Sequence, residues 1–108
     1  MRILAIDPGS ERSAWVLWDG VKIINHAYET NEDVLELVTL EAPAIKFLVI
    51  EMIASYGMPV GKEVFETCVL VGRLWQACDM VVGDSRTQLL YRKDIKMHLC
   101  GSMQAKDS

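Results

Sequence analysis

Two apolar segments of this chain each run directly into an acidic residue, and this repeated pattern constrains the fold more than any other feature. The first segment is RILAI, followed by Asp7, Pro8 and Gly9, and the second is IKFLVI, followed by Glu51. A continuous apolar run of this length is typical of a central strand that is covered on both faces. Because burial of a lone carboxylate is strongly destabilising, each acid needs a partner, a metal ion or water at its strand end.

The residues between these two runs predict a hairpin and then a helix. The segments SAWVLWD and VKIINHAY are rich in Val, Ile, Trp and Tyr, and the dipeptide Asp19-Gly20 joins them. This dipeptide favours a type I′ turn, which needs positive φ at both central positions. Thr30 or Asn31 can then cap a helix that ends at Pro43. The apolar side of that helix is expected to consist of Val34, Leu35, Leu37, Val38 and Leu40.

The helix makes the connection between the two apolar runs a crossover. Strands that are joined by a helical crossover most often lie parallel, so we expect the fourth strand to lie beside the first. That arrangement would bring Asp7 and Glu51 together. Two adjacent carboxylates repel each other unless they share a proton or a cation, so the sequence predicts a shared cation site.

The second half of the chain predicts a long helix from about Pro59 to Cys78. Its apolar stripe comprises Val60, Val64, Cys68, Val71, Trp75 and Cys78, with Phe65 and Leu74 widening it. Gly72 lies inside the helix, which indicates a close backbone contact there. The opposite face is polar except for Val69, so a dimer interface stays open beside the core interpretation. A short strand at 88–91 and a basic helical segment, RKDIKMHL, follow.

Length and composition indicate one folded domain, residues 1–108, because 51% of the residues are hydrophobic and 24% are charged. The apolar runs are too short to span a membrane, and MRILAID reaches its acid too early for a secretory signal. We therefore expect a cytoplasmic protein without a membrane partner. The three cysteines and two histidines show neither CxxC nor HxxxH spacing, which argues against a disulfide framework and against a zinc site.

Charge is distributed unevenly along the chain, although the net charge is −4. Residues 1–85 contain 6 Lys or Arg and 13 Asp or Glu, whereas residues 86–108 contain 5 basic and 2 acidic residues. A polyanion would be bound where the basic side chains are concentrated, in the last fifth of the chain. An ordinary solvated helix face is the alternative interpretation of the same segment.

The order of elements is that of the ribonuclease H-like fold, an α/β fold whose mixed sheet has three antiparallel strands followed by parallel strands and is flanked by helices. Within this order, IDPGS, VIE at the end of the fourth strand, VGR in the long helix and the ending YRKDIKMHLCGSMQAKDS resemble the RuvC-type Holliday-junction resolvases, notably their short phage and prophage versions. The resemblance covers essentially all 108 residues.

The resemblance implies a structure-selective endonuclease that cuts branched DNA as a homodimer, by metal-dependent phosphodiester hydrolysis. Asp7 and Glu51 would be its catalytic residues and would bind Mg²⁺, with Mn²⁺ as a substitute. Mg²⁺ prefers carboxylate and water oxygens, and two such ions about 4 Å apart can activate the nucleophile and stabilise the leaving oxygen. The implied nucleic-acid-binding residues are Lys96 and Lys106, with Arg73 and Arg92 as weaker candidates.

The chain also departs from that family, which completes its metal site with one or two aspartates on a final helix. Residues 1–108 are expected to lack this helix, and Asp107 lies beside Lys106, where it cannot replace those acids. Cleavage by this chain alone is therefore open. A non-catalytic ribonuclease H-like module that binds DNA or dimerises is one alternative. An ATP-binding fragment of the actin and sugar-kinase superfamily, whose first strand also ends in an Asp-x-Gly turn, is another.

Overall fold

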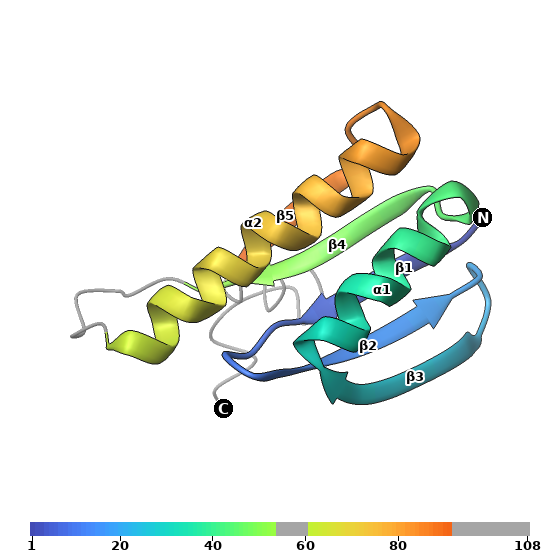
Figure 1. Ribbon diagram of the computed structural model, residues 1–108. Coiled ribbons are helices and arrows are strands. Elements are labelled where there is room, and N and C mark those ends of the chain that lie inside the picture. The colour runs from blue at the N-terminus through green and yellow to red at the C-terminus, as the bar shows by residue number, and fades with distance from the viewer. Residues whose placement is uncertain (54–60, 92–108) are drawn as a thin grey trace.

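A five-stranded mixed sheet lies at the centre of the structure, a computed structural model that describes residues 1–53 and 61–91 (Figure 1). The strands are β1 (Ile3–Asp7), β2 (Arg12–Trp18), β3 (Ile23–Thr30), β4 (Phe47–Met52) and β5 (Thr87–Tyr91). Their spatial order is β3-β2-β1-β4-β5; β1 pairs with β2 and β2 with β3 in antiparallel orientation, whereas β4 is parallel to both β1 and β5. The predicted α/β mixed sheet is confirmed.

Two helices, α1 (Asn31–Glu41) and α2 (Lys62–Val82), cover one face of this sheet, and a 3₁₀ turn (Ala42–Ala44) follows α1 (Figure 1). Alternate residues of β1 show which face is covered, because Leu4 and Ile6 are buried while Ala5 between them is half-buried. The core between sheet and helices contains apolar residues from both layers, among them Leu4, Ile6, Trp15, Leu17, Val34, Val38, Leu48, Ile50, Leu70 and Leu74. Neither helix is long and apolar enough to cross a membrane, in the part of the chain described.

The β2–β3 hairpin forms as predicted, but its turn is longer than a two-residue type I′ turn. Residues 19–22 separate the two strands. Asp19 Oδ1 accepts hydrogen bonds from the backbone N–H groups of Val21 and Lys22, both at 2.8 Å, and Gly20 has φ of 101°. These two hydrogen bonds hold the pKa of the Asp19 carboxyl below its usual value. Asp19 therefore closes the turn with its side chain.

Helix α1 begins where the sequence predicted. The Thr30 hydroxyl accepts a hydrogen bond from the backbone N–H of Asp33 at 3.3 Å, so Thr30 is the N-cap. Val34 and Val38 are fully buried against the sheet. Leu40 was placed on the apolar side incorrectly, because it is 70% exposed. At 3.6 residues per turn, a residue two positions after Val38 lies on the opposite side of the helix.

Helix α2 runs further than predicted at its carboxyl end. It continues four residues beyond Cys78 to Val82, where Gly83 adopts φ of 74° and donates its backbone N–H to the Asp79 carbonyl. Pro59 and Val60, from the predicted start, lie outside the described residues. The buried stripe consists of Thr67, Leu70, Val71, Leu74 and Cys78. Phe65 does not widen this stripe, since it is 62% exposed.

Two glycines differ sharply in the space around them. Among the described residues, apart from its chain neighbours and the nearby backbone of its own helix, a Cβ atom added to Gly72 in the middle of α2 would meet no atom within 4 Å. The predicted close backbone contact at Gly72 is therefore wrong. A Cβ atom added to Gly9, in the loop between β1 and β2, would clash with the backbone carbonyl oxygen of Arg12. The loop after Asp7 therefore requires glycine, whereas α2 does not.

We expect Gly72→Ala to raise the free energy of unfolding by about 1 kcal/mol, because alanine reduces the backbone entropy of the unfolded chain and its methyl group has room in the helix. Gly9→Ala should lower the free energy of unfolding through the clash with the Arg12 carbonyl. Urea denaturation followed by circular dichroism measures both. A destabilised Gly72→Ala variant would contradict the open environment of this residue.

Candidate active site

The pairing of β1 with β4 places Asp7 and Glu51 on adjacent strands. Ile6 is the register partner of Ile50, so the next residues of the two parallel strands are Asp7 and Glu51. Neighbouring strands lie about 4.8 Å apart. Ile6 and Ile50 are buried beneath the helices, and successive side chains of a strand point to opposite faces. Both acids therefore project from the face of the sheet opposite to α1 and α2.

Both acids line one pocket of about 210 Å³. Asp7 is exposed and Glu51 is half-buried. The rest of the lining is mostly apolar and comes from three strands: Ala5, Ile6, Ala14, Trp15, Val16 and Val49. The predicted pairing of the fourth strand with the first is thus confirmed, and both acids line one pocket; their role as metal ligands stays a prediction. β4 continues one residue beyond Glu51, to Met52.

A closed ring of hydrogen bonds fixes the loop that follows Asp7. The Gly9 N–H donates to Ser13 Oγ at 3.2 Å, and the Ser13 hydroxyl donates to Asn31 Oδ1 at 2.6 Å. Asn31 Nδ2 then donates to the Gly9 carbonyl at 3.0 Å. Ser13 is fully buried and Asn31 is only 9% exposed, so water competes little for these groups. The ring ties the β1–β2 loop, β2 and the first residue of α1 together.

Sequence reasoning considered Asn31 only as a helix cap and did not identify Ser13. The available signal was the alternation of β2, which assigns Ser13 to the same buried face as Trp15 and Leu17. A hydroxyl at a core position needs a hydrogen-bond partner. That partner, Asn31, lies eighteen residues away in the sequence, and the spacing alone did not indicate it.

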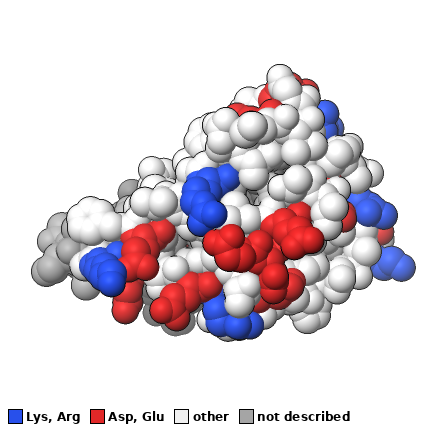
Figure 2. All heavy atoms as spheres, viewed as in Figure 1, with Lys and Arg blue, Asp and Glu red and all other residues white. Residues whose placement is uncertain are grey.

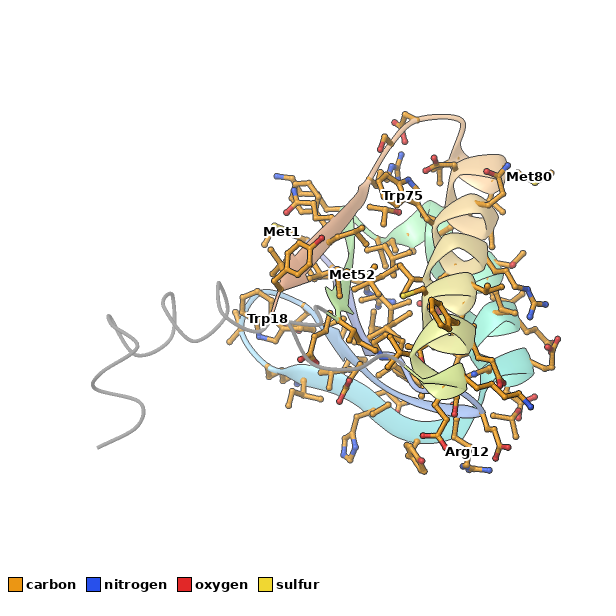
Figure 3. All side chains as sticks on the ribbon, turned by 90° about the vertical axis from the view of Figure 1, so that its left-hand side faces the viewer. Met1, Arg12, Trp18, Met52, Trp75 and Met80 are labelled. Atoms are coloured by element: carbon orange, nitrogen blue, oxygen red, sulfur yellow. The ribbon has the colours of Figure 1, made fainter. Side chains whose placement is uncertain are left out.

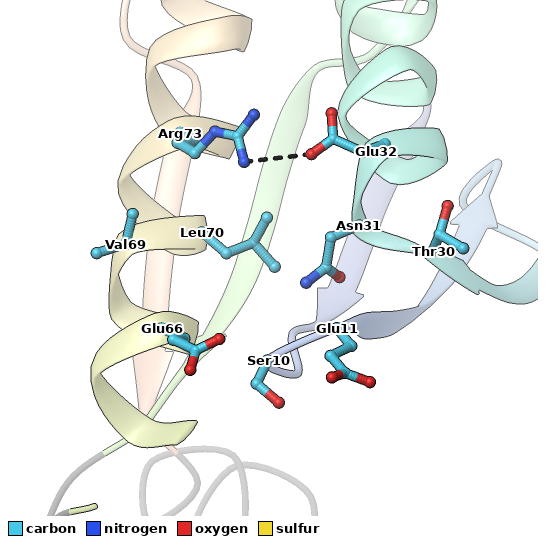
Figure 4. A pocket seen from close by; sticks show the side chains of 9 residues that line it. All are labelled: Ser10, Glu11, Thr30, Asn31, Glu32, Glu66, Val69, Leu70 and Arg73. Atoms are coloured by element: carbon cyan, nitrogen blue, oxygen red, sulfur yellow. Dashed lines mark hydrogen bonds and ion pairs between the residues drawn. The ribbon is translucent and has the colours of Figure 1, made fainter. Parts of the chain in front are cut away.

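Arg73, one of the predicted DNA-binding residues, lies away from the two acids. It projects from α2 into a second pocket of about 460 Å³, where its Nη1 lies 3.4 Å from Glu32 Oε1 (Figure 4). Glu11 and Glu66 line the same pocket. Acidic side chains gather on this face of the molecule (Figure 2). Arg73 thus lies in acidic surroundings, and its role in DNA binding stays a prediction.

The other three basic residues of the prediction, Lys96, Lys106 and Arg92, lie outside the described residues. Within residues 1–53 and 61–91, no group of three or more His, Cys, Asp or Glu side chains gathers as a metal site. The donor chemistry of Asp7 and Glu51 nevertheless fits Mg²⁺. This ion is commonly held by one or two carboxylates, and waters and substrate phosphates complete its coordination.

Two solved structures of RuvC from Thermus thermophilus have a similar fold. The first matches with a TM-score of 0.67 and 11% identity, over 94% of this chain and 70% of RuvC. The second, RuvC in complex with a Holliday junction substrate, matches with a TM-score of 0.67 and 10% identity, over 92% of this chain and 69% of RuvC. This likeness shows that the chain has a ribonuclease H-like fold.

Other comparisons add little to this result. The Aquifex aeolicus PPX-GPPA enzyme matches with a TM-score of 0.43 and 12% identity, over 86% of this chain and 36% of that enzyme, which is too weak to carry an argument. No protein-family model matches the sequence, and no curated protein matches it.

We expect Asn31→Ala to lower the free energy of unfolding by about 1–3 kcal/mol, since it leaves the Ser13 hydroxyl and the Gly9 carbonyl without their partner in a buried place. Asn25→Ala is the matched control. Asn25 is exposed, and its side chain accepts a hydrogen bond only from the adjacent His26 N–H among the described residues. Urea denaturation of both variants measures the difference, and equal stabilities would refute a structural role for the ring.

Proposed function

We propose that this chain is a RuvC-like, structure-selective endonuclease that acts on branched DNA, including Holliday junctions, by divalent-metal-dependent hydrolysis of a phosphodiester bond. The observation that carries the proposal is the placement of Asp7 and Glu51 in one pocket on the sheet face opposite to the helices. The junction-bound T. thermophilus neighbour supports branched DNA as the partner. The proposal includes the short phage or prophage type and a cytoplasmic location, which the sequence resemblance implies.

Asp7 and Glu51 are the residues that would hold Mg²⁺ or Mn²⁺. When bound, such ions supply a hydroxide nucleophile and neutralise the charge of the phosphate and the leaving oxygen. Asp7 ends β1, and the buried ring of Gly9, Ser13 and Asn31 fixes the loop directly after it. Glu51 belongs to β4 itself. Both carboxylates are therefore held by rigid elements, as a site that binds a charged substrate in one orientation requires.

A homodimer is part of the proposal, because a four-way junction has near two-fold symmetry and an isologous dimer matches that symmetry. Helix α2 offers the surface for it. Phe65 and Val69 are 62% and 64% exposed on the side of α2 away from the sheet. Exposed large apolar side chains four residues apart on one helix form the contact that a second copy could cover.

A non-catalytic module that binds branched DNA is the second candidate function. The observation that favours it is the small number of ligands: among the described residues, Asp7 and Glu51 are the only two acids that line this pocket. Two protein carboxylates hold Mg²⁺ weakly without further ligands. Under this alternative the chain binds a junction but leaves it uncut.

We expect Asp7→Asn and Glu51→Gln each to reduce cleavage of a synthetic four-way junction by about 100-fold or more, because the bound metal contributes several kcal/mol to transition-state stabilisation. Junction binding should persist, and Asp7→Asn should tighten it by removing a negative charge near the DNA. Glu36→Gln, an exposed acid on α1, is the control and should cleave like the parent. A parent protein that binds the junction in Mg²⁺ or Mn²⁺ without cutting it would favour the non-catalytic module.

Replacing both Lys96 and Lys106 by alanine should lower the magnitude of the salt slope by nearly two units, where the salt slope is that of the logarithm of the junction association constant against the logarithm of the salt concentration. Each phosphate contact releases condensed counterions and contributes about 0.9 to this slope. The double variant Lys22→Ala and Lys46→Ala removes the same charge from other segments and serves as control. Fluorescence anisotropy with a labelled junction measures the slope. A slope equal to that of the parent would mean that the two lysines form an ordinary solvated surface.

A further inference from the structure

Arg12 and Tyr28 lie on the same face and at the same end of the sheet as the two acids. Asp7 is the register partner of Ala14 in β2, and Ala14 is the register partner of Tyr28 in β3. Register partners on neighbouring strands project from the same face, so Asp7, Ala14 and Tyr28 form one row across the sheet. Arg12 precedes Ala14 by two residues and therefore shares this face. In Figure 3, Arg12 is labelled at the opposite end of β2 from Trp18.

The guanidinium of Arg12 is held in place by two contacts with one residue. Its Cζ lies 5.0 Å from the centroid of the Tyr28 ring, and its Nη2 donates a hydrogen bond to the Tyr28 carbonyl at 3.0 Å. Tyr28 is 63% exposed, so the pair is accessible to a large ligand. A guanidinium that is already stacked on a ring loses less conformational freedom when it binds an anion.

Arg12 is one of three described basic residues, with Lys22 and Lys46, whose side chains form no ion pair with another described residue. Most basic side chains of the described residues form ion pairs, namely those of Arg2, Lys62, Arg73 and Arg86. Arg12 forms no ion pair within residues 1–53 and 61–91. A guanidinium has five N–H donors in a planar fork that matches phosphate oxygens. Its positive charge is therefore available to an anion that lies on this face.

We propose that Arg12, oriented by Tyr28, binds a backbone phosphate of the DNA strand whose scissile phosphate lies at Asp7 and Glu51. The inference rests on the proposed function and adds a second contact to it. Tyr28 and Asp7 are separated by two strand spacings, which is about 10 Å. The phosphates of one strand follow a helical path, so neighbouring phosphates lie further apart than the axial rise of about 3.4 Å per nucleotide. The contact therefore lies one or two nucleotides from the scissile bond.

Ala14 leaves room for the DNA strand to cross the sheet between the two acids and Arg12. It lies between Asp7 and Tyr28 in the row, and it lines the same pocket as the acids. Its methyl group leaves the surface hollow where a larger side chain would fill it. The phosphate contact at Arg12 also offsets the repulsion between the DNA backbone and the two carboxylates, so this cation contributes more to binding than an isolated surface charge.

The test is junction binding by the full chain in Ca²⁺, measured by fluorescence anisotropy over a range of salt concentrations. We expect Arg12→Ala to weaken binding about five- to tenfold and to lower the salt slope by about 0.9. Arg12→Lys should keep the slope but weaken binding two- to threefold, because the planar fork is lost. Tyr28→Phe should bind like the parent, whereas Tyr28→Ala should weaken binding two- to fivefold without a change in slope.

Lys46→Ala is the matched control. Lys46 also lies over an aromatic ring, with its Nζ 5.7 Å from the Phe47 centroid, but it precedes β4 and so lies at the opposite end of the sheet. Lys46→Ala should leave the slope unchanged. If Arg12→Ala and Lys46→Ala weaken junction binding equally, the effect is one of net charge. That result would overturn the inference about Arg12 but not the proposed function. A folded parent protein that does not bind the junction at all would overturn the proposed function and, with it, this contact.

A neutral methylphosphonate placed at successive positions of one strand locates the contact. In the parent, one position one or two nucleotides from the scissile bond should weaken binding when neutralised. Arg12→Ala should abolish this sensitivity, while Asp7→Asn should retain it. Sensitivity at the same position in both the parent and Arg12→Ala would assign the contact to another residue and refute the proposal. Thermal unfolding confirms that each variant is folded.

Discussion

The parallel pairing of β1 with β4 is the interaction on which the rest of the structure depends. Its register aligns Ile6 with Ile50, which buries both side chains beneath the helices and sends Asp7 and Glu51 to the other face. A shift by one residue in either strand would exchange the two faces, placing a carboxylate in the core and an isoleucine at the surface. The burial of apolar side chains therefore specifies the position of the acids.

One face of the sheet stabilises the fold, and the other presents the candidate site. One face packs against α1 and α2 and provides most of the apolar burial. The other carries the carboxylates of Asp7 and Glu51 and the Arg12–Tyr28 pair, all at one end. The hydrogen-bonded ring of Gly9, Ser13 and Asn31 connects the candidate site to the helical layer, since it links the loop after Asp7 to the start of α1. The helical layer thus stabilises the site through this ring, although neither α1 nor α2 lies over it.

Much of this arrangement could be predicted from local patterns. The apolar runs ending in Asp7 and Glu51, the hairpin at Asp19 and the helix start at Thr30 all rest on signals within a few residues. Features that depend on distant partners escaped prediction. Phe65 has the spacing of a core residue, but the position of the sheet relative to α2 leaves it exposed. The contact of Arg12 with Tyr28 depends on the β2–β3 register, which the turn and the register shift between Leu17 and Trp18 determine together.

The topology also has a kinetic consequence for the candidate site. The β2–β3 hairpin is closed by a turn of four residues, whereas Ile6 and Ile50 meet only after the hairpin, α1 and the 3₁₀ turn have been traversed. Closing a longer loop loses more chain entropy, and contacts between distant residues slow folding. A chain emerging during synthesis can form the hairpin early. The carboxylate pair is then expected to assemble after the hairpin, and it exists only in molecules in which β1 and β4 have paired.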